Sequence, residues 1–174
     1  NDPEVRCLVL TGAGGAFCAG GDVKGFASDA GSDRKASGKG PNYETLVQGL
    51  RQGMEISKQL HVMPKPTLAL IPGPAAGAGL SLALACDLRF CLDTAKITTA
   101  FSKIGASGDY GGSYFLPRLV GAAKARELYF TADVISGQEA YELGIMTKVA
   151  SADTFEAESK EYARYLASLP TVAL

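Results

Sequence analysis

The stretch PTLALIPGPAAGAGLSLALACDL, residues 66–88, decides the fold of this chain. Thr67 to Ile71 is a short apolar run that follows two prolines, which is typical of a buried strand. Leu80 to Cys86 has almost no polar side chain, which predicts a helix packed on every side. Asp87 ends this helix, and Leu88 to Leu92 predicts the next strand. The stretch therefore indicates a strand, a tight turn and a central helix in direct succession.

The turn inside this stretch has two interpretations. Gly73 and Pro74 mark it, and Gly77, Ala78 and Gly79 then bring small residues to the start of the helix. The first amides of a helix have no partner within the helix and carry the positive end of its dipole. Such an amide can hold an oxyanion, because small residues let a substrate approach the main chain. Alternatively, the small residues only allow tight packing between helix and strand.

Composition places the chain among ordinary globular proteins. Of its 174 residues 47% are hydrophobic and 20% are charged. The net charge of −1 gives no indication of nucleic acid or an anionic membrane as a partner. No apolar run reaches the length of a membrane span without a charge, glycine or proline. The first residues do not form a signal peptide, and the length predicts one domain, residues 1–174.

Cysteine and histidine usage narrows the chemistry. The four cysteines form no CxxC pair, which predicts reduced thiols in a cytosolic protein. His61 is the only histidine in the sequence. We therefore expect no metal site and no Ser-His relay, and we interpret His61 as structural.

The N-terminal part predicts a strand followed by two loops. Val5 to Leu10 has the pattern of a buried strand, and a strand so close to the first residue indicates a fragment of a longer chain. Thr11 to Asp22 is glycine-rich, but Phe17 stands where the dinucleotide pattern GxGxxG needs its third glycine. A short helix is expected from Ala19 to Phe26. Ser28 to Asn42 predicts a mobile surface loop, which either gates a site or is a plain insertion.

The rest of the chain alternates between strands and helices, which indicates a layered α/β domain. We expect strands at Lys96–Ala100 and Ile145–Ala150. The first expected helix is Tyr43–His61, with an apolar face at residues 43, 46, 47, 50 and 54. Two helices should follow at Ser113–Val120, which Pro117 interrupts, and at Ala122–Phe130. A short helix is expected after the capping box Ser136–Glu139 and ends at Gly144, and the last is Asp153–Leu169, with a second capping box of Asp153 and Glu156.

Glycine-rich loops at residues 11–22, 73–79 and 105–112 could form one site, since each lies at the end of a strand or the start of a helix. Two amides that converge on a carbonyl oxygen stabilise an enolate, and losing one such donor typically costs about 3 kcal/mol. Asp109 in the third loop would then move a proton at a neighbouring carbon. Alternatively, Asp109 is a turn residue whose carboxylate accepts from backbone amides.

The ordered motifs of nearly the whole chain resemble the enoyl-CoA hydratase/isomerase (crotonase) superfamily. Each motif alone is weak, but their combination in this order is highly specific. They are Ala16-Phe17-Cys18-Ala19-Gly20-Gly21-Asp22, Gly73 to Leu88, Gly108-Asp109-Tyr110-Gly111-Gly112, Leu116 to Gly121, and Ile135 to Ala140 with Leu143-Gly144-Ile145.

This resemblance implies an α/β fold of the crotonase/ClpP-like type, a spiral of ββα units. The opening strands and the C-terminal helices of the family are expected to be absent from this sequence. The resemblance also implies an acyl-CoA thioester as substrate, with coenzyme A entering as part of the substrate and no separate cofactor. A cytoplasmic homotrimer or hexamer, with neither nucleic acid nor membrane as a partner, is the implied assembly.

By motif position, the resemblance assigns the oxyanion-binding amides to Gly21 and Ala78. Many members carry glycine in place of Ala78, but a main-chain donor tolerates this difference. The segment that resembles the coenzyme A contact of the family comprises Ala19, Gly20, Asp22, Val23 and Lys24.

The departures from the family pattern bear on the reaction. The two glutamates with which hydratases add water are replaced here by Ser81 and Phe101, and neither side chain is a carboxylate. Asp109 matches an aspartate of members that isomerise double bonds or rings in CoA esters. The resemblance thus favours an isomerase with Asp109 as proton shuttle, and Ser81, Phe101, Tyr110 and Tyr114 are expected to shape the acyl pocket.

Three other interpretations remain open at this point. One is an enoyl-CoA hydratase with unorthodox water activation, and another is an acyl-CoA-binding protein without catalysis. The third is a serine hydrolase, because the sequences around Ser81 and Ser107 each miss the pattern GxSxG by one residue. A serine-reactive phosphonate would label one of these serines only in the hydrolase.

Overall fold

The computed structural model describes residues 2–21 and 43–170, and β1 (Leu8–Thr11) is the one regular element of the first range. The elements of the second range follow one another in this order: α3 (Tyr43–Val62), β2 (Thr67–Ile71), β3 (Ala75–Ala76), α4 (Ala78–Ala85), β4 (Leu88–Leu92), β5 (Lys96–Thr98), the 3₁₀-helix η1 (Phe101–Ile104), α5 (Gly112–Thr131), β6 (Ile135–Ser136), α6 (Gly137–Glu142), β7 (Lys148–Ala150) and α7 (Phe155–Ser168).

Two sheets organise these elements. The larger sheet is parallel throughout and has the order β1-β2-β4-β7. The smaller sheet has the order β3-β5-β6, in which β3 and β5 are parallel and β5 and β6 antiparallel. Parallel strands need long crossovers between them, and here the crossovers carry the helices. The α/β class expected from the sequence is therefore present.

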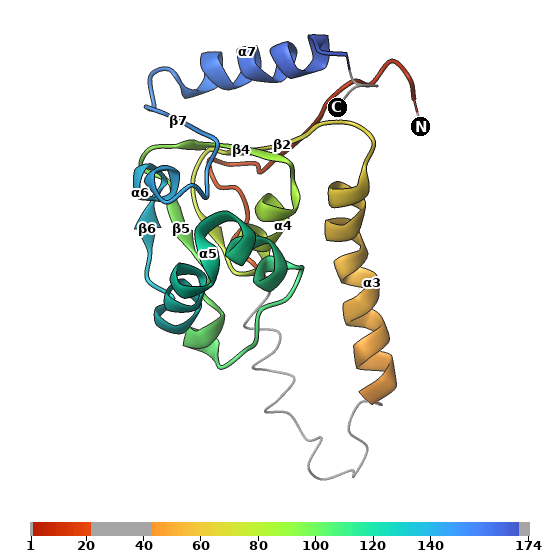
Figure 1. Cartoon of the computed structure of the whole chain (residues 1–174), viewed down its shortest axis with the longest axis vertical. Coiled ribbons are helices and arrows are strands. Elements are labelled where there is room, and N and C mark those ends of the chain that lie inside the picture. The colour runs from red at the N-terminus through yellow and green to blue at the C-terminus, as the bar shows by residue number, and fades with distance from the viewer. Residues whose placement is uncertain (1, 22–42, 171–174) are drawn as a thin grey trace.

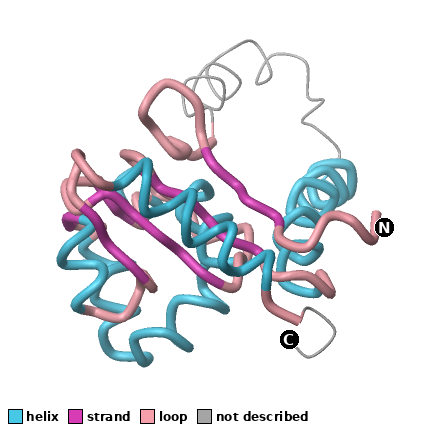
Figure 2. The backbone as a smooth tube through the Cα atoms, turned by 90° about the horizontal axis from the view of Figure 1, so that it is seen from above, coloured by secondary structure: helices cyan, strands magenta, loops and turns pink. Residues whose placement is uncertain are grey.

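Helices cover both faces of the larger sheet. Leu68 and Phe90 face one side, where they pack with Leu166 of α7. Ala69 and Cys91, one residue further along each strand, belong to the cluster on the other side, which includes α4 and α5. This alternation is the period of two that a strand imposes, and buried parallel strands are apolar on both faces for this reason. Figure 1 shows α7 above the sheet and α4 below it, and Figure 2 shows the strands between helices.

The helix predicted to be central is central. Six of the eight residues of α4 are buried, and α4 packs against α3, α5 and β4. Its start is two residues earlier than expected, at Ala78. The helix expected at residues 43–61 is also present as α3, which stands along one side of the molecule (Figure 1).

Several expected boundaries were wrong. β1 begins at Leu8 instead of Val5. Leu8 pairs with Thr67, the first residue of β2, and Pro66, which precedes Thr67, has no amide to donate to a longer β1. β7 begins at Lys148 instead of Ile145, because the amides of Ile145 and Met146 donate to the carbonyl oxygen of Ala140 inside α6. β5 stops at Thr98, and Ala100 with φ 58° turns the chain into η1.

The second capping box was also wrong. Thr154 is the N-cap of α7 and its side chain makes no capping bond, so Asp153 lies in the preceding turn and Glu156 pairs with Lys160. The first capping box, Ser136 with Glu139, is confirmed.

The apolar face expected on α3 was partly wrong. Tyr43 is 80% exposed and Leu50 is 48% exposed, whereas Ser57 and Leu60 are buried. The last turns of the helix therefore supply its burial, and Tyr43 and Leu50 face outward.

Candidate active site

The first two glycine-rich loops pack directly against each other. A methyl group on Gly73 would lie 2.0 Å from the carbonyl oxygen of Gly15, and one on Gly79 would lie 2.3 Å from that of Cys18. Neither position has room for a side chain, because the neighbouring atoms belong to the backbone. The glycines therefore let the loop before residue 21 seat itself on the first turn of α4.

The start of α4 presents a free backbone amide. Gly77 has φ 53° and ψ −123° and caps the helix without any side-chain bond. As the first residue of the helix, Ala78 has an amide with no partner inside it, and no bond to this amide is found within residues 2–21 and 43–170. A methyl group on Gly20 would lie 3.7 Å from the nitrogen of Ala78. The structure thus brings the Gly20–Gly21 segment beside the Ala78 amide.

The third loop carries Asp109 to the same region. Gly111 has φ 81° and Tyr110 has φ 50°, so the chain turns sharply between Asp109 and α5. Asp109 is half-buried, and its Oδ1 atom is buried without a hydrogen-bond partner in the described part of the chain. Burial raises the pKa of this carboxyl group, and a hydrogen bond from its own backbone amide opposes the rise. A carboxyl group in this state is suited to accept and return a proton.

Ser81 joins this loop to α4. A methyl group on Gly112 would lie 2.4 Å from Oγ of Ser81 and 2.5 Å from the hydroxyl oxygen of Tyr129. Oγ of Ser81 also donates to the carbonyl oxygen of Gly77, at 3.2 Å. Because α5 starts with a glycine, both hydroxyl groups reach the loop that holds Asp109.

Tyr129 is a site residue that the sequence analysis missed. Its ring stacks on Phe101 with centroids 6.2 Å apart and planes 15° apart. Burial raises the pKa of Tyr129 to about 12, the charge of Asp109 adds to the rise, and a hydrogen bond with Ser81 opposes it. No local signal marks this residue, because it lies in the second half of α5 and reaches the site only through the kink of that helix.

The four expected pocket residues fall into two groups. Ser81 and Phe101 lie with Tyr129, and Phe101 reaches within 3.8 Å of a methyl group built on Gly77. Tyr110 and Tyr114 instead line an apolar hollow of about 260 Å³ between α3 and the start of α5. The other residues that line it are Met54, Ser57, Lys58, His61, Gly111 and Phe115.

The hollow between α3 and the start of α5 is lined by aromatic rings and contains the buried hydroxyl group of Ser57. His61 meets Phe115 edge to face at 5.1 Å, which agrees with a packing role for that ring. Oγ of Ser57 is buried and has no partner among the described residues. The hollow is therefore apolar, with a single buried polar group that can bond to a ligand.

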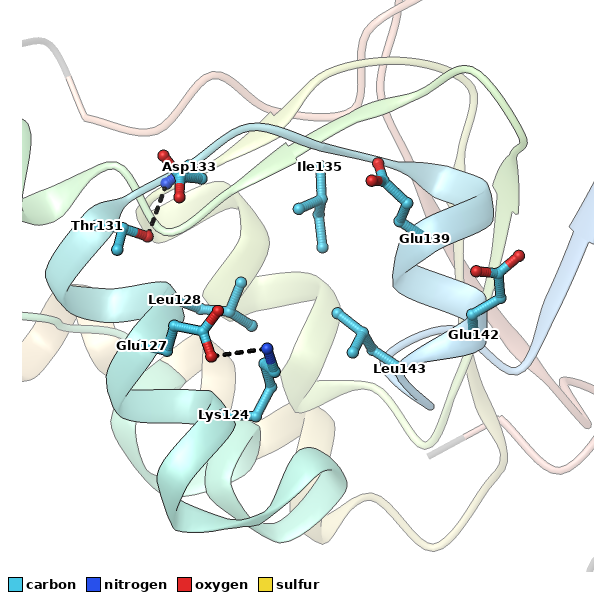
Figure 3. Close-up of a pocket in the computed structure, with 9 residues that line it drawn as sticks. All are labelled: Lys124, Glu127, Leu128, Thr131, Asp133, Ile135, Glu139, Glu142 and Leu143. Atoms are coloured by element: carbon cyan, nitrogen blue, oxygen red, sulfur yellow. Dashed lines mark hydrogen bonds and ion pairs between the residues drawn. The ribbon is translucent and has the colours of Figure 1, made fainter.

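A second hollow of about 300 Å³ lies between α5, β6 and α6, and Figure 3 shows its lining. Glu127, Asp133, Glu139 and Glu142 bring four carboxyl groups to it, against one lysine, Lys124. Lys124 is paired with Glu127 at 2.6 Å (Figure 3). Like charges repel, so this hollow is unsuited to the phosphate groups of coenzyme A. None of the residues expected at the site lines it.

The residues expected to contact coenzyme A are only partly described. Ala19 is exposed, and Gly20 with φ 95° turns the chain toward Gly21. Asp22, Val23 and Lys24 lie outside the described residues, as do most of the helix expected at 19–26 and the loop expected at 28–42. In the part of the chain that is described, no cluster of three or more His, Cys, Asp or Glu side chains could hold a metal ion.

The chain matches the family model of enoyl-CoA hydratase/isomerase over residues 1–174. It therefore belongs to the enoyl-CoA hydratase/isomerase family, as its motifs predicted. A solved enoyl-CoA hydratase from Polaromonas sp. JS666 superposes with a TM-score of 0.85 at 34% identity, covering 98% of this chain and 63% of that one. This similarity confirms the crotonase-type fold.

Relatives with different names are about equally similar. The 1,2-epoxyphenylacetyl-CoA isomerase of Escherichia coli K12 is 36% identical over 173 residues, which are 99% of this chain and 63% of that protein. A probable enoyl-CoA hydratase of Rhodobacter capsulatus is 36% identical over 171 residues, 98% of this chain and 62% of that protein. For 4-chlorobenzoyl coenzyme A dehalogenase-1 of Arthrobacter sp the identity is 38% over 175 residues, 98% of this chain and 59% of that protein. The chain thus spans less than two thirds of the length of each of these relatives.

Proposed function

We propose that this protein acts on acyl-CoA thioesters by stabilising an enolate, and that its reaction is the isomerisation of a double bond or ring in an enoyl-CoA. The convergence of the three glycine-rich loops at the start of α4 carries this proposal. The amide of Ala78 is unpaired among the described residues, and Gly20, which precedes Gly21, lies against it. The amides of Gly21 and Ala78 would bind the thioester oxygen, where negative charge develops.

Asp109 supplies the proton transfer in this proposal. Its carboxylate removes a proton from the carbon next to the carbonyl group, and the electron pair of the broken C–H bond moves into the thioester as an enolate. The same carboxyl group then returns the proton at another carbon of the acyl chain. One group suffices because no water is added, which agrees with Ser81 and Phe101 standing where hydratases carry glutamates. Two relatives, one from Escherichia coli and one peroxisomal protein from Arabidopsis thaliana, are named isomerases of CoA esters.

The substrate would lie between two groups of residues. Coenzyme A would contact the segment of Ala19, Gly20, Asp22, Val23 and Lys24. The acyl group would pass Ser81 and Phe101 and extend toward the hollow lined by Tyr110 and Tyr114. The apolar lining of that hollow supports an acyl group of hydrophobic character.

A paired assay tests the reaction. The purified protein is given a 3-enoyl-CoA and a 2-enoyl-CoA in deuterated water, and the products are followed by mass spectrometry. We expect double-bond migration, with deuterium in the product wherever the proton on Asp109 exchanges with solvent before its return, and a loss of at least about 100-fold in Asp109→Asn, the usual scale of general acid–base catalysis. Full turnover of Asp109→Asn would contradict the proposed role of the carboxyl group.

The other outcomes identify the alternatives. Addition of water would indicate a hydratase with unorthodox water activation. The similarity to a probable enoyl-CoA hydratase of Rhodobacter capsulatus supports this alternative. Binding without either reaction would indicate an acyl-CoA-binding protein, or a substrate with another acyl group.

Assembly and location stay predictions. A homotrimer or hexamer agrees with the exposed apolar side chains of α3, such as Tyr43, Leu50 and Ile56. The mass of the protein in solution, measured by light scattering, decides the assembly. Across residues 2–21 and 43–170, no helix is both long and apolar enough to cross a membrane.

A further inference from the structure

The side chain of Tyr129 returns to the start of its own helix. Gly121, with φ 77° and ψ 161°, breaks α5 into two halves. In a continuous helix, residues 112 and 129 would be about 25 Å apart along the axis. Instead, a methyl group on Gly112 would lie 2.5 Å from the Tyr129 hydroxyl oxygen. The kink therefore directs a tyrosine into the site from the far end of the helix.

The ring of Tyr129 supports the loop that carries Asp109. A methyl group on Gly108 would lie 2.9 Å from Cε1 of Tyr129, so the ring packs directly under the residue before Asp109. Phe101 stacks against the same ring. The loop is thus held between Tyr129 and the start of α5.

Two oxygen atoms near the Tyr129 hydroxyl group could accept from it, although Oδ1 of Asp109 does not do so in the structure. Oγ of Ser81 uses its own proton for the carbonyl oxygen of Gly77, so its lone pairs can accept from Tyr129. The buried Oδ1 of Asp109 has no donor in the described part of the chain. Turning the Asp109 side chain toward Tyr129 would give Oδ1 this donor, and Tyr129 stays protonated at neutral pH because burial raises its pKa to about 12.

We propose that Tyr129 is the positioning residue for Asp109: its ring fixes the loop that carries the carboxyl group, and its hydroxyl group, shared with Ser81, supplies the donor that the buried carboxylate oxygen lacks. This inference rests on the proposed function, in which Asp109 is the proton shuttle. Oδ1 of Asp109 accepts no hydrogen bond from the described residues, so in this proposal the ionised Asp109 side chain turns to accept from the Tyr129 hydroxyl. When Asp109 has taken the substrate proton, the hydroxyl donates to Ser81 instead.

The variant Tyr129→Phe removes the hydroxyl group and keeps the ring. We expect kcat for the isomerisation of a 3-enoyl-CoA to fall about 10- to 100-fold, the range for a hydrogen bond to a charged group. KM should change little. Without this donor the carboxylate is less stable, so the pKa of Asp109 rises and the acidic limb of the kcat profile moves to higher pH.

A titration without substrate gives an independent measurement. The ¹³C signal of the Asp109 carboxyl carbon is assigned by its loss in Asp109→Asn and followed against pH. We expect its midpoint to be higher in Tyr129→Phe than in the unmodified protein. Tyr165→Phe is the matched control, because Tyr165 is 56% exposed on α7 and packs with Tyr162 away from this site.

Two results would overturn the inference. One is a Tyr129→Phe protein with unchanged kcat and an unchanged Asp109 titration, which would mean that only the ring matters. The other is an equal loss from Tyr129→Phe when Asp109→Asn is already present, which would place Tyr129 in a separate role. Full activity of Asp109→Asn would instead refute the proposed function, and the carboxyl titration would still decide the Tyr129 assignment.

Discussion

The carboxyl groups of Asp87 and Asp109 have opposite surroundings. The carboxylate of Asp87, at the end of α4, accepts from the amide and the hydroxyl group of Thr67 at 2.8 and 2.7 Å. Asp109, in a glycine-rich loop, has a buried oxygen without a partner among the described residues. Hydrogen bonds to a carboxylate stabilise its charged form, whereas burial alone destabilises it. The hydrogen bonds of Asp87 therefore stabilise the fold, whereas the buried, unpartnered oxygen of Asp109 lowers its stability.

This contrast predicts how stability depends on pH. The pKa of Asp109 is raised in the native state, whereas an aspartate in the unfolded chain titrates near pH 3.9. The native protein thus binds this proton more tightly, and it loses stability as the pH rises through the native pKa. Asp109→Asn avoids that loss. We expect it to be more stable at pH 7 by at most about 1 kcal/mol, or about 2–4 °C in Tm.

Thermal melting at several pH values measures this effect. The difference between Asp109→Asn and the unmodified protein should vanish below about pH 3.5, where both native and unfolded aspartates are protonated. Partial exposure of Asp109 lets water screen its charge, which keeps the expected gain small. Asp87→Asn is the matched control and should lower Tm at pH 7. A lower Tm for Asp109→Asn at pH 7 would show that its carboxylate stabilises the fold.

At the scale of one element, α4 is both the centre of the core and the floor of the site. Its apolar side chains enter the cluster between the sheet and α5, and its first turn meets the loop of Cys18. Gly79 therefore serves both packing and chemistry. Tight packing and oxyanion binding, the two interpretations of this turn, do not exclude each other. Tight helix–loop contact is what brings Gly20 to the Ala78 amide.

The first turn of α4 should tolerate no added atom. In Gly79→Ala the new methyl group would meet the carbonyl oxygen of Cys18 at 2.3 Å, and backbone must move. We expect a loss of about 1–3 kcal/mol in the free energy of unfolding, typical of an overpacked core. Activity should fall with it, because the loop of Gly20 is displaced from Ala78. Urea unfolding and the isomerase assay measure the two effects.

Gly49→Ala is the control for this substitution. Gly49 is exposed on α3 with nothing within 4 Å of an added methyl group. Alanine is about 1 kcal/mol more favourable than glycine inside a helix, so this variant should be as stable as the unmodified protein or more so. An equal loss in both variants would show that the tight contact at Gly79 is not the cause.

At the scale of the whole molecule, one buried arginine connects three parts of the fold. Arg89 of β4 donates from Nε to the carbonyl oxygen of Ile145 and from Nη1 to that of Cys86, each at 2.7 Å. It thereby ties the end of α4 to the segment before β7. Burial lowers the pKa of this guanidinium group, and nearby Cys86 and Asp87 oppose the change. No ion pair of Arg89 is found in the described part of the chain, so carbonyl dipoles balance its charge.

Replacing this arginine tests whether the connection stabilises the molecule. Arg89→Met keeps much of the volume but leaves two carbonyl groups without donors. We expect a loss of about 2–3 kcal/mol, because hydrogen bonds from charged donors are stronger than neutral ones. Arg118→Met is the control, since Arg118 is exposed and bonds within its own helix to Tyr114. Equal urea midpoints for Arg89→Met and the unmodified protein would mean that relief from burying the charge cancels the lost bonds.

Much of the fold was predictable because its signals are local. The bounds of β2 and β4 agree with the expected strands, and the capping box of Ser136 and Glu139 is present. The break in α5 at Gly121 also lies where the sequence divides two helices. β3 and β6 were missed, because each has two residues and becomes a strand only through pairing with β5.

Of the site, the sequence by itself determined the loops and the carboxyl group that they offer. Small residues before α4 and a lone aspartate among glycines are visible as letters, since glycine content and periodicity are local properties. Only the tertiary structure decided that Tyr129 lies beside Asp109 and Ser81, and that Tyr110 and Tyr114 line a separate hollow. The physical reason is that a kink at Gly121 returns the end of α5 to its start, and contacts between residues far apart in sequence leave no periodic pattern.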